Sequence, residues 1–108
     1  MSSYNRLNGT YMTENRRLLT HVLKQEWGFD GMVMSDWSAI HTTVGAVNAG
    51  LDLEMPGPPR YYGEMLVRAI RNAQVEIEQL DENVRRVLRT VFRTGVMDAV
   101  RRPAGELG

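Results

Sequence analysis

The chain of 108 residues contains no cysteine. This absence excludes a disulfide framework and any zinc site with thiolate ligands. The two histidines, His21 and His41, are far apart and lack the His-x-x-x-His spacing that places two ligands on one helix face. We therefore expect each histidine to be a surface or capping residue, and we expect neither a metal nor a cofactor.

Long apolar runs and an excess of either charge are also missing. No stretch approaches the ~20 apolar residues that cross a bilayer, and residues 1–6 lack the apolar centre of a signal peptide. The 13 basic and 13 acidic residues balance, which argues against nucleic acid or a membrane surface as a partner. With 43% hydrophobic residues, the composition predicts one packed domain.

Apolar residues at helical spacing predict helices along much of the chain. The predicted helices cover residues 13–27, 40–48, 62–73 and 81–94. Thr13 and Asp81 are the expected caps of the first and last of these helices. Gly28 and Gly95 stand where helices commonly stop. The last helix carries an apolar stripe that we expect to face the core, formed by Val84, Val87, Leu88, Val91 and Phe92.

Short apolar stretches that predict β-strands lie between these helices. Residues 32–37 follow a turn-rich stretch, residues 51–55 are halted by a run of prolines, and residues 75–77 form a further extended stretch. Alternating strands and helices imply parallel strands joined by right-handed crossovers. Because so few strands would leave long unpaired edges, the pattern is typical of a slice of a larger α/β fold.

Asp36 ends the strand predicted at residues 32–37. The carboxyl ends of parallel strands are where α/β enzymes display reactive side chains, so this position favours a chemical role. An aspartate after a strand also commonly caps the following helix. Position alone leaves both interpretations open.

Several motifs in a fixed order connect the chain to a known family. They are Ser3-Tyr4-Asn5, Trp27-Gly28-Phe29-Asp30-Gly31, Val33-Met34-Ser35-Asp36-Trp37, Ala49-Gly50-Leu51-Asp52-Leu53-Glu54-Met55-Pro56-Gly57 and Val84-Arg85-Arg86-Val87-Leu88. Together they resemble glycoside hydrolase family 3, the group of β-glucosidases, β-xylosidases and β-N-acetylglucosaminidases. The resemblance extends over nearly all of the chain, and a lone Ser-Asp-Trp motif would be far less specific.

The resemblance implies an α/β fold that is part of a larger barrel. Family members begin with a (β/α)8 TIM barrel, or a variant of one, and such a barrel needs ~250 residues. This chain resembles only the last three strand–helix units and a closing helix, which predicts a partial barrel over residues 1–98 and a flexible tail over 99–108. The family's upstream sugar-binding residues and its second domain, which carries the general acid, have no counterpart here, so we expect a fragment.

The same resemblance implies roles for three residues. Retaining glycosidases use two carboxyl groups ~5–5.5 Å apart, one of which attacks the anomeric carbon. Asp36 matches the family's nucleophile. Tyr4 matches a tyrosine that lies near it and could donate a hydrogen bond, and Trp37 matches a tryptophan that lines the sugar subsite. Packing at a domain edge is the alternative for Tyr4, and packing at the strand end is the alternative for Trp37.

Two other groups of charged residues have structural interpretations. Asp52 and Glu54 alternate in a predicted strand, and we expect them to hold loops through hydrogen bonds rather than to supply the acid. Four arginines of helix 81–94 lie largely opposite the apolar stripe, and we expect a solvated face that pairs with nearby acids. These are Arg85, Arg86, Arg89 and Arg93. A phosphate-binding face is the alternative for this helix.

Three functions follow from these features. The first is a fragment of a retaining, exo-acting β-glycosidase that acts on a β-linked glucoside or related saccharide through Asp36 and is inactive alone. The second is a non-catalytic interaction module that uses helix 81–94 to bind nucleic acid or protein. The third is a module that associates with another copy, or with the missing half of the barrel, through open sheet edges.

Overall fold

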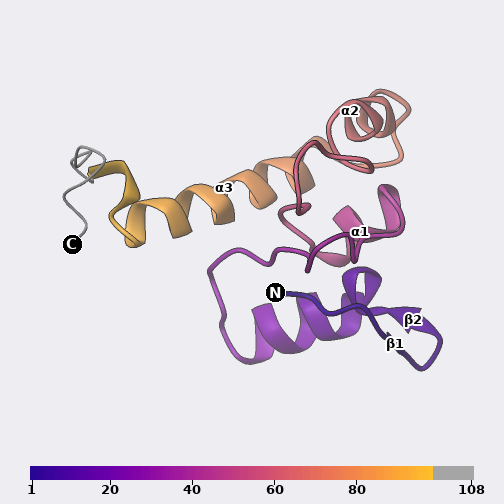
Figure 1. The fold of residues 1–108 in the computed structure, drawn as a ribbon, viewed down its shortest axis with the longest axis horizontal. Coiled ribbons are helices and arrows are strands. Elements are labelled where there is room, and N and C mark those ends of the chain that lie inside the picture. Colours follow the sequence, from indigo (N-terminus) through magenta and orange to yellow (C-terminus); the bar gives the residue numbers. More distant parts are fainter. Residues whose placement is uncertain (99–108) are drawn as a thin grey trace, which may run out of the picture.

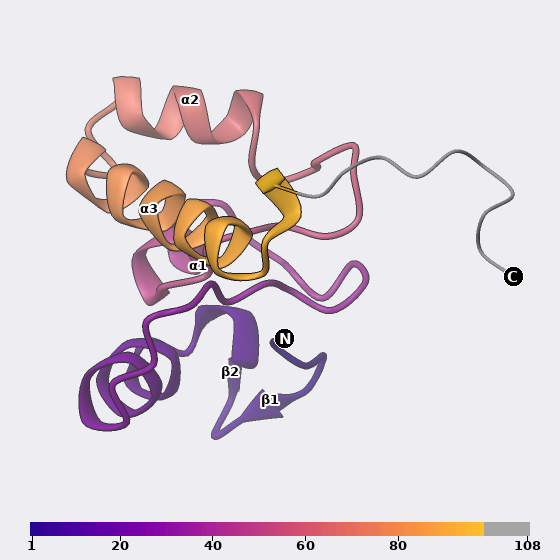
Figure 2. The ribbon, with the colours of Figure 1, turned by 90° about the vertical axis from the view of Figure 1, so that its left-hand side faces the viewer.

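The computed structural model describes residues 1–98, and the tail predicted at 99–108 lies outside the described residues. From bottom to top, Figures 1 and 2 show the helices η2 (Arg17–Glu26), α1 (Val44–Ala49), α3 (Ile77–Arg93) and α2 (Glu64–Arg71). The shorter elements are β1 (Arg6–Leu7), β2 (Thr10–Tyr11) and the 3₁₀ turns η1 (Met12–Glu14) and η3 (Val96–Asp98). α1 contacts both η2 and α3, so it lies at the centre. None of the described helices is long and apolar enough to cross a membrane.

The β1–β2 hairpin is formed around a tight turn near the start of the chain. Arg6 pairs with Tyr11 across the two antiparallel strands. Asn8 and Gly9 connect the strands with φ angles of 50° and 84°. Positive φ at both central residues is what a type I′ hairpin turn requires, and an Asn-Gly pair tolerates it. The sequence marks this turn but does not predict the short strands beside it.

The first helix begins later than predicted. Thr13 lies in η1, and its buried hydroxyl donates to the backbone oxygen of Ala39 (3.3 Å) instead of capping the helix. Asn15 acts as the cap, because its side-chain oxygen accepts a hydrogen bond from the backbone N–H of Leu18 (3.0 Å). The helix η2 that follows is a π-helix. Gly28, with a φ of 67°, follows its end as predicted.

α1 and α2 are shorter than predicted at their starts. α1 begins at Val44 rather than at residue 40, and Ile40 instead lies in the core as part of a non-helical segment. α2 begins at Glu64 rather than at residue 62, because Gly63 has a left-handed φ of 64° that cannot belong to an α-helix. α1 ends before Gly50, whose φ of 107° agrees with the predicted stop.

α3 is longer than predicted. It begins at Ile77, so Asp81 lies inside the helix and is not its cap. Glu76 precedes the helix with an extended backbone (φ −72°, ψ 142°), and the predicted extended stretch therefore ends before Ile77. Gly95, with a φ of 74°, follows the helix end as predicted.

Three extended segments run in parallel next to one another. Single bridges pair Ser2 with Ser35 and Met34 with Leu53. The backbone N–H of Ser2 donates to Met34 (2.7 Å), that of Asp36 donates to Ser2 (2.8 Å), and that of Ser35 donates to Leu53 (3.0 Å). The predicted parallel arrangement is confirmed. The strands predicted at residues 32–37 and 51–55, on either side of α1, are not continuous strands, and a single bridge between Met34 and Leu53 joins them.

The core consists of two apolar clusters. One contains Leu19, Val33, Ile40, Ala46 and Leu51, and the other contains Val47, Leu66, Ala69 and Val75. The stripe predicted for the last helix is partly wrong, because Val84, Leu88 and Phe92 are 46%, 49% and 60% exposed. Asn83 is buried instead, and its amide donates to the backbone oxygen of Leu51 (3.3 Å). α3 therefore packs on the rest of the fold partly through a polar group.

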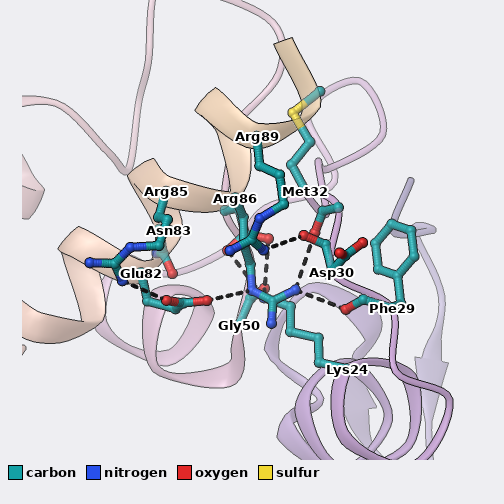
Figure 3. A network of polar contacts seen from close by, with 12 residues as sticks. Lys24, Phe29, Asp30, Met32, Gly50, Glu82, Asn83, Arg85, Arg86 and Arg89 are labelled. Atoms are coloured by element: carbon teal, nitrogen blue, oxygen red, sulfur yellow. Dashed lines mark hydrogen bonds and ion pairs between the residues drawn. The ribbon is translucent and has the colours of Figure 1, made fainter. Parts of the chain in front are cut away.

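Arginines of α3 bind the backbone that leads into the middle extended segment (Figure 3). Arg86 donates to the backbone oxygens of Phe29 (2.9 Å) and Gly31 (3.3 Å). Arg89 donates to the backbone oxygen of Asp30 (2.7 Å). These contacts differ from the predicted solvated face, because two arginines satisfy carbonyl groups of a neighbouring loop.

The predicted pairing of these arginines with acids is confirmed for Arg85, Arg86 and Arg93 but not for Arg89. Glu82 accepts hydrogen bonds from Arg85 (2.8 Å) and Arg86 (3.1 Å) on the same helix. Arg93 forms an ion pair with the carboxylate of Asp30. This pair connects the end of α3 to the loop before the middle segment.

A buried ion pair joins η2 to the third extended segment. Lys24 Nζ lies 3.1 Å from the Asp52 carboxylate, and the two side chains are 7% and 0% exposed. Lys24 also donates to the backbone oxygen of Gly50 (2.7 Å), and Asp52 accepts from the backbone N–H of Val33 (2.8 Å). Burial raises the pKa of Asp52 and lowers the pKa of Lys24, since desolvation disfavours both charges. Asp52 therefore holds a helix and a neighbouring segment rather than a loop.

Replacing Lys24 by methionine is expected to destabilise the fold by about 3–5 kcal/mol, because the buried carboxylate of Asp52 loses its cation. Urea unfolding followed by circular dichroism measures this change. Arg68→Met is the matched control, since the Arg68–Glu64 pair is 70% exposed on both sides and exposed pairs contribute about 0–1 kcal/mol. Equal losses in the two variants would contradict the prediction.

The Asp30 carboxyl is expected to titrate with a pKa of about 2, because the hydrogen bond from Arg93 favours its charged form. A lowered folded-state pKa means that the contribution to stability is present above pH ~4 and is lost as the pH falls towards 2. NMR of the side-chain carboxyl carbons follows this titration. In Arg93→Gln the midpoint should return towards the ordinary value, and an unchanged midpoint would exclude Arg93 as the cause.

Candidate active site

Asp36 lies at the carboxyl end of the middle extended segment. Its backbone N–H donates to Ser2 (2.8 Å) in the neighbouring segment. On the other side, the fully buried hydroxyl of Ser35 accepts from the N–H of Met55 (2.9 Å) and donates to the oxygen of the same residue (3.3 Å). Hydrogen bonds to both neighbouring segments therefore fix the backbone at Ser35 and Asp36.

Two donors converge on one oxygen of the half-buried Asp36 side chain. The Tyr4 hydroxyl donates to Oδ1 (2.9 Å), and the backbone N–H of Trp37 donates to the same atom (2.6 Å). Within residues 1–98, Oδ2 accepts no hydrogen bond. The carboxylate is thus held in one orientation with one oxygen still available.

Tyr4 reaches Asp36 because its segment is paired with the middle segment at Ser2. The predicted hydrogen bond between the two side chains is confirmed. It raises the pKa of the Tyr4 phenol, because a carboxylate acceptor with its negative charge favours the protonated form.

The chain turns sharply after Asp36 and leaves the Trp37 ring exposed. Trp37 is 60% exposed among the described residues, so its ring makes little contact with the strand end there. Ser38 has a φ of 61° and donates its N–H to Met55 (3.0 Å), while Ala39 donates to the backbone oxygen of Asp36 (3.0 Å). A left-handed non-glycine residue is uncommon and is often retained at functional sites. The Asp36 side chain accepts the N–H of Trp37 at the start of this turn. It does not cap a helix, since α1 begins at Val44.

The nearby carboxylates of the third segment are already occupied. Glu54 accepts hydrogen bonds from the backbone N–H groups of residues 60, 61 and 62 (2.9, 3.0 and 2.7 Å), which confirms its predicted role in holding a loop. Asp52 is bound to Lys24. In the part of the chain that the structure describes, no cluster of three or more histidine or acidic side chains is arranged to hold a metal ion.

A cavity of about 450 Å³ opens beside the turn that follows Trp37. It is bounded by residues 55–61 on one side and by Ser38 and His41 on the other. The His41 ring stacks on Tyr11, with centroids 3.6 Å apart and planes 15° from parallel. The cavity was not predicted from the sequence. The prolines at positions 56, 58 and 59, directly after the third segment, do indicate a rigid loop, and this loop forms one wall of the cavity.

A carboxylate, a phenol donor and an exposed indole at the carboxyl ends of parallel segments are typical of an α/β enzyme domain. The family model described as "Glycosyl hydrolase family 3 N terminal domain" matches residues 1–90. A beta-glucosidase of Rhizobium radiobacter is 56% identical over 98 residues, and probable beta-glucosidase J of Emericella nidulans is 48% identical over 94 residues. These matches cover 91% and 87% of this chain.

Solved structures agree with this relationship. Beta-glucosidase D2-BGL from Chaetomella raphigera matches 93% of this chain with 43% identity and a TM-score of 0.85. Beta-glucosidase 3B from Thermotoga neapolitana, in complex with glucose, matches 84% with 43% identity and a TM-score of 0.79. The chain therefore belongs to glycoside hydrolase family 3, in the region of its N-terminal domain. It spans 12% of the Rhizobium radiobacter protein and 15% of the Chaetomella raphigera chain.

Replacing Asp36 by alanine is expected to lower the pKa of Tyr4 towards its ordinary value, because the acceptor and its charge are removed. NMR of the tyrosine ring carbons follows each phenol separately. Tyr62 is the internal control, since burial raises its pKa independently of Asp36. If the Tyr4 pKa does not move, the hydrogen bond between the two side chains is not its cause.

Proposed function

We propose that residues 1–98 are the nucleophile-bearing part of a retaining, exo-acting β-glucosidase. The observation that carries this proposal is the Asp36 carboxylate, which has one oxygen fixed by Tyr4 and Trp37 and a second oxygen without a partner in the described residues. A β-glucoside is the proposed substrate because relatives at 48–56% identity are named beta-glucosidases and a similar structure holds glucose.

The same proposal assigns the three extended segments to neighbouring strands of a (β/α)8 barrel, with α3 as the closing helix. Two observations support it. The segments pair in parallel and in chain order, as consecutive barrel strands do. η2 and α1 each lie between two of these segments in the chain, at the positions of crossover helices.

In the proposed reaction, Oδ2 of Asp36 attacks the anomeric carbon and forms a glycosyl ester as the glycosidic C–O bond breaks. The leaving oxygen takes a proton from a general acid. Water then gives a proton to that same group, now a base, attacks the anomeric carbon and releases the sugar and the free carboxylate. The hydrogen bonds from Tyr4 and from the backbone of Trp37 hold the carboxylate in one orientation for the first step. The exposed Trp37 ring offers an apolar face on which a pyranose can stack.

The general acid is not expected among the neighbouring carboxylates. Glu54 is bound by three backbone N–H groups, and Asp52 is buried against Lys24. Either side chain would have to break these contacts before it could carry and release a proton. The described residues thus supply a nucleophile without its acid, and we expect the 108-residue chain alone to be inactive.

A chimaera tests the nucleophile in a complete enzyme. In it, residues 1–98 replace the matching stretch of the Rhizobium radiobacter beta-glucosidase. We expect hydrolysis of an aryl β-glucoside, and we expect Asp36→Asn to lower kcat by more than ~10³-fold, because an amide cannot form the glycosyl ester. A fluorinated glucoside that traps glycosyl-enzyme intermediates should label the peptide that contains Asp36, as detected by mass spectrometry.

Glu64→Gln, on the exposed face of α2, is the control for the chimaera and should retain activity. Label on another peptide, or activity retained in Asp36→Asn, would overturn the assignment of Asp36. The purified 108-residue chain is assayed in parallel. Hydrolysis by that chain, abolished in Asp36→Asn, would show that the chain contains its own acid.

A further inference from the structure

The Asn8–Gly9 turn at the tip of the β1–β2 hairpin is not used by the proposed reaction. The tip projects from the edge of the fold (Figures 1 and 2), and both residues are exposed. Within residues 1–98 the Asn8 side chain forms no hydrogen bond, and the backbone N–H of Gly9 donates to no acceptor. The side-chain amide and the backbone nitrogen that follows it are therefore both available for reaction.

These two groups can react with each other. Attack of the Gly9 nitrogen on Cγ of Asn8 closes a five-membered ring, and a neighbouring group in the same chain acts as a reactant at high effective concentration. A side chain on the second residue would shield its nitrogen, and glycine has none. No atom lies within 4 Å of the position that a Cβ of Gly9 would take, so the approach is open.

The turn is also close to the backbone conformation that the ring requires. Ring closure sets the ψ angle of the asparagine to the value of the first central residue in a type II′ turn, and types I′ and II′ share a positive φ at that residue. Asn8 already has a φ of 50°. Only the peptide unit before Gly9 has to rotate, which glycine permits because it adopts φ of either sign. The hairpin can thus reach the reactive conformation with its strands still paired.

The chain contains one other pair in which glycine follows an asparagine or aspartate, Asp30–Gly31, and its surroundings differ. Arg93 forms an ion pair with the Asp30 carboxylate and lowers its pKa to about 2, so this group is ionised at neutral pH and resists attack. A Cβ on Gly31 would lie 2.9 Å from the Phe29 ring, so the space beside this glycine is filled. The structure therefore separates two pairs that look alike in sequence.

We propose that Asn8 is a site of spontaneous deamidation. The Gly9 nitrogen gives up its proton and bonds to Cγ of Asn8, the Cγ–Nδ2 bond breaks, and ammonia leaves with that proton. Water then opens the resulting succinimide. Attack at Cγ gives aspartate, whereas attack at the main-chain carbonyl carbon gives isoaspartate, whose backbone runs through the side chain. The reaction needs only the hairpin and water, so it is independent of the proposed function.

Isoaspartate at position 8 adds one backbone atom to a two-residue turn. That turn fixes the register in which Arg6 pairs with Tyr11. The Arg6 guanidinium lies 4.4 Å from the centre of the Tyr11 ring and donates to its hydroxyl (3.1 Å), and the same ring stacks on His41. The longer turn changes this register and moves Tyr11 off the His41 ring.

The modification is measured on the full 108-residue chain, kept folded at neutral pH and physiological temperature for several weeks. Peptide mass spectrometry should show the peptide with Asn8 gaining one mass unit, and an isoaspartyl methyltransferase should methylate it. Asn72 is the internal control, because it is also exposed but precedes Ala73, whose N–H donates to Ile70 (3.0 Å). Asn72 should react at least ~10-fold more slowly, a barrier difference of ~1.4 kcal/mol.

Three results would overturn the proposal, and the main measurement needs no variant that has to fold. They are no conversion at Asn8, equal conversion at Asn72, and isoaspartate at Asp30 to the same extent as at Asn8, which would show that the sequence pair alone decides. Asn8→Gln should stop the reaction at this position, because the corresponding ring would have six members.

The effect on the hairpin is tested by NMR. The isoaspartate form should lose the nuclear Overhauser contacts between the rings of Tyr11 and His41, which are stacked with centroids 3.6 Å apart. Asn8→Asp is the matched control, since it introduces the same charge without the extra backbone atom, and it should retain these contacts. Contacts that persist in the isoaspartate form, or that Asn8→Asp loses equally, would exclude the longer turn as the cause.

Discussion

The buried carboxylate of Asp52 is the contact on which the arrangement of the site depends. It accepts hydrogen bonds from Lys24 and from the backbone of Val33, so a helix and two extended segments meet at one charge. Because Val33 lies shortly before Asp36, this contact fixes the register of the segment that carries the proposed nucleophile. Side chains alternate along an extended backbone, so a slip of one residue would turn Asp36 to the opposite face.

α3 supports the same register from another direction. The Thr90 hydroxyl accepts from the backbone N–H of Met32 (3.0 Å), and Arg86 binds the carbonyl groups of Phe29 and Gly31. The middle segment is paired with its neighbours at only a few residues, so the backbone groups at its start need other hydrogen-bond partners. Side chains of α3 provide those partners. Polar contacts therefore attach α3 to the fold while part of its apolar stripe stays exposed.

The sequence predicted the position of Asp36 better than the bounds of the helices. Asp36 follows an apolar run, so its position at a strand end could be predicted from local pattern. Tyr4 is remote in sequence, and only the resemblance pointed to it, because the pairing of Ser2 with Ser35 that brings it close is a tertiary contact. Thr13 was the expected cap, but its hydroxyl is used in the interior. No local pattern could show that the Thr13 hydroxyl would bind the Ala39 carbonyl instead of capping a helix. Nor could one show that Ser38 and residues 55–61 lie on opposite sides of one cavity.

Three carboxylates lie at or near the strand ends, and the hydrogen bonds that each already has separate their roles. Asp52 has a buried cation and a backbone donor, and Glu54 has three backbone donors, so protonation or attack by either would cost its structural contacts. Asp36 has both its donors on one oxygen, and the other oxygen can react while the side chain stays in place. Unused hydrogen-bonding capacity on a fixed frame, rather than residue type, therefore distinguishes the carboxylate that we propose to react from those that hold the fold together.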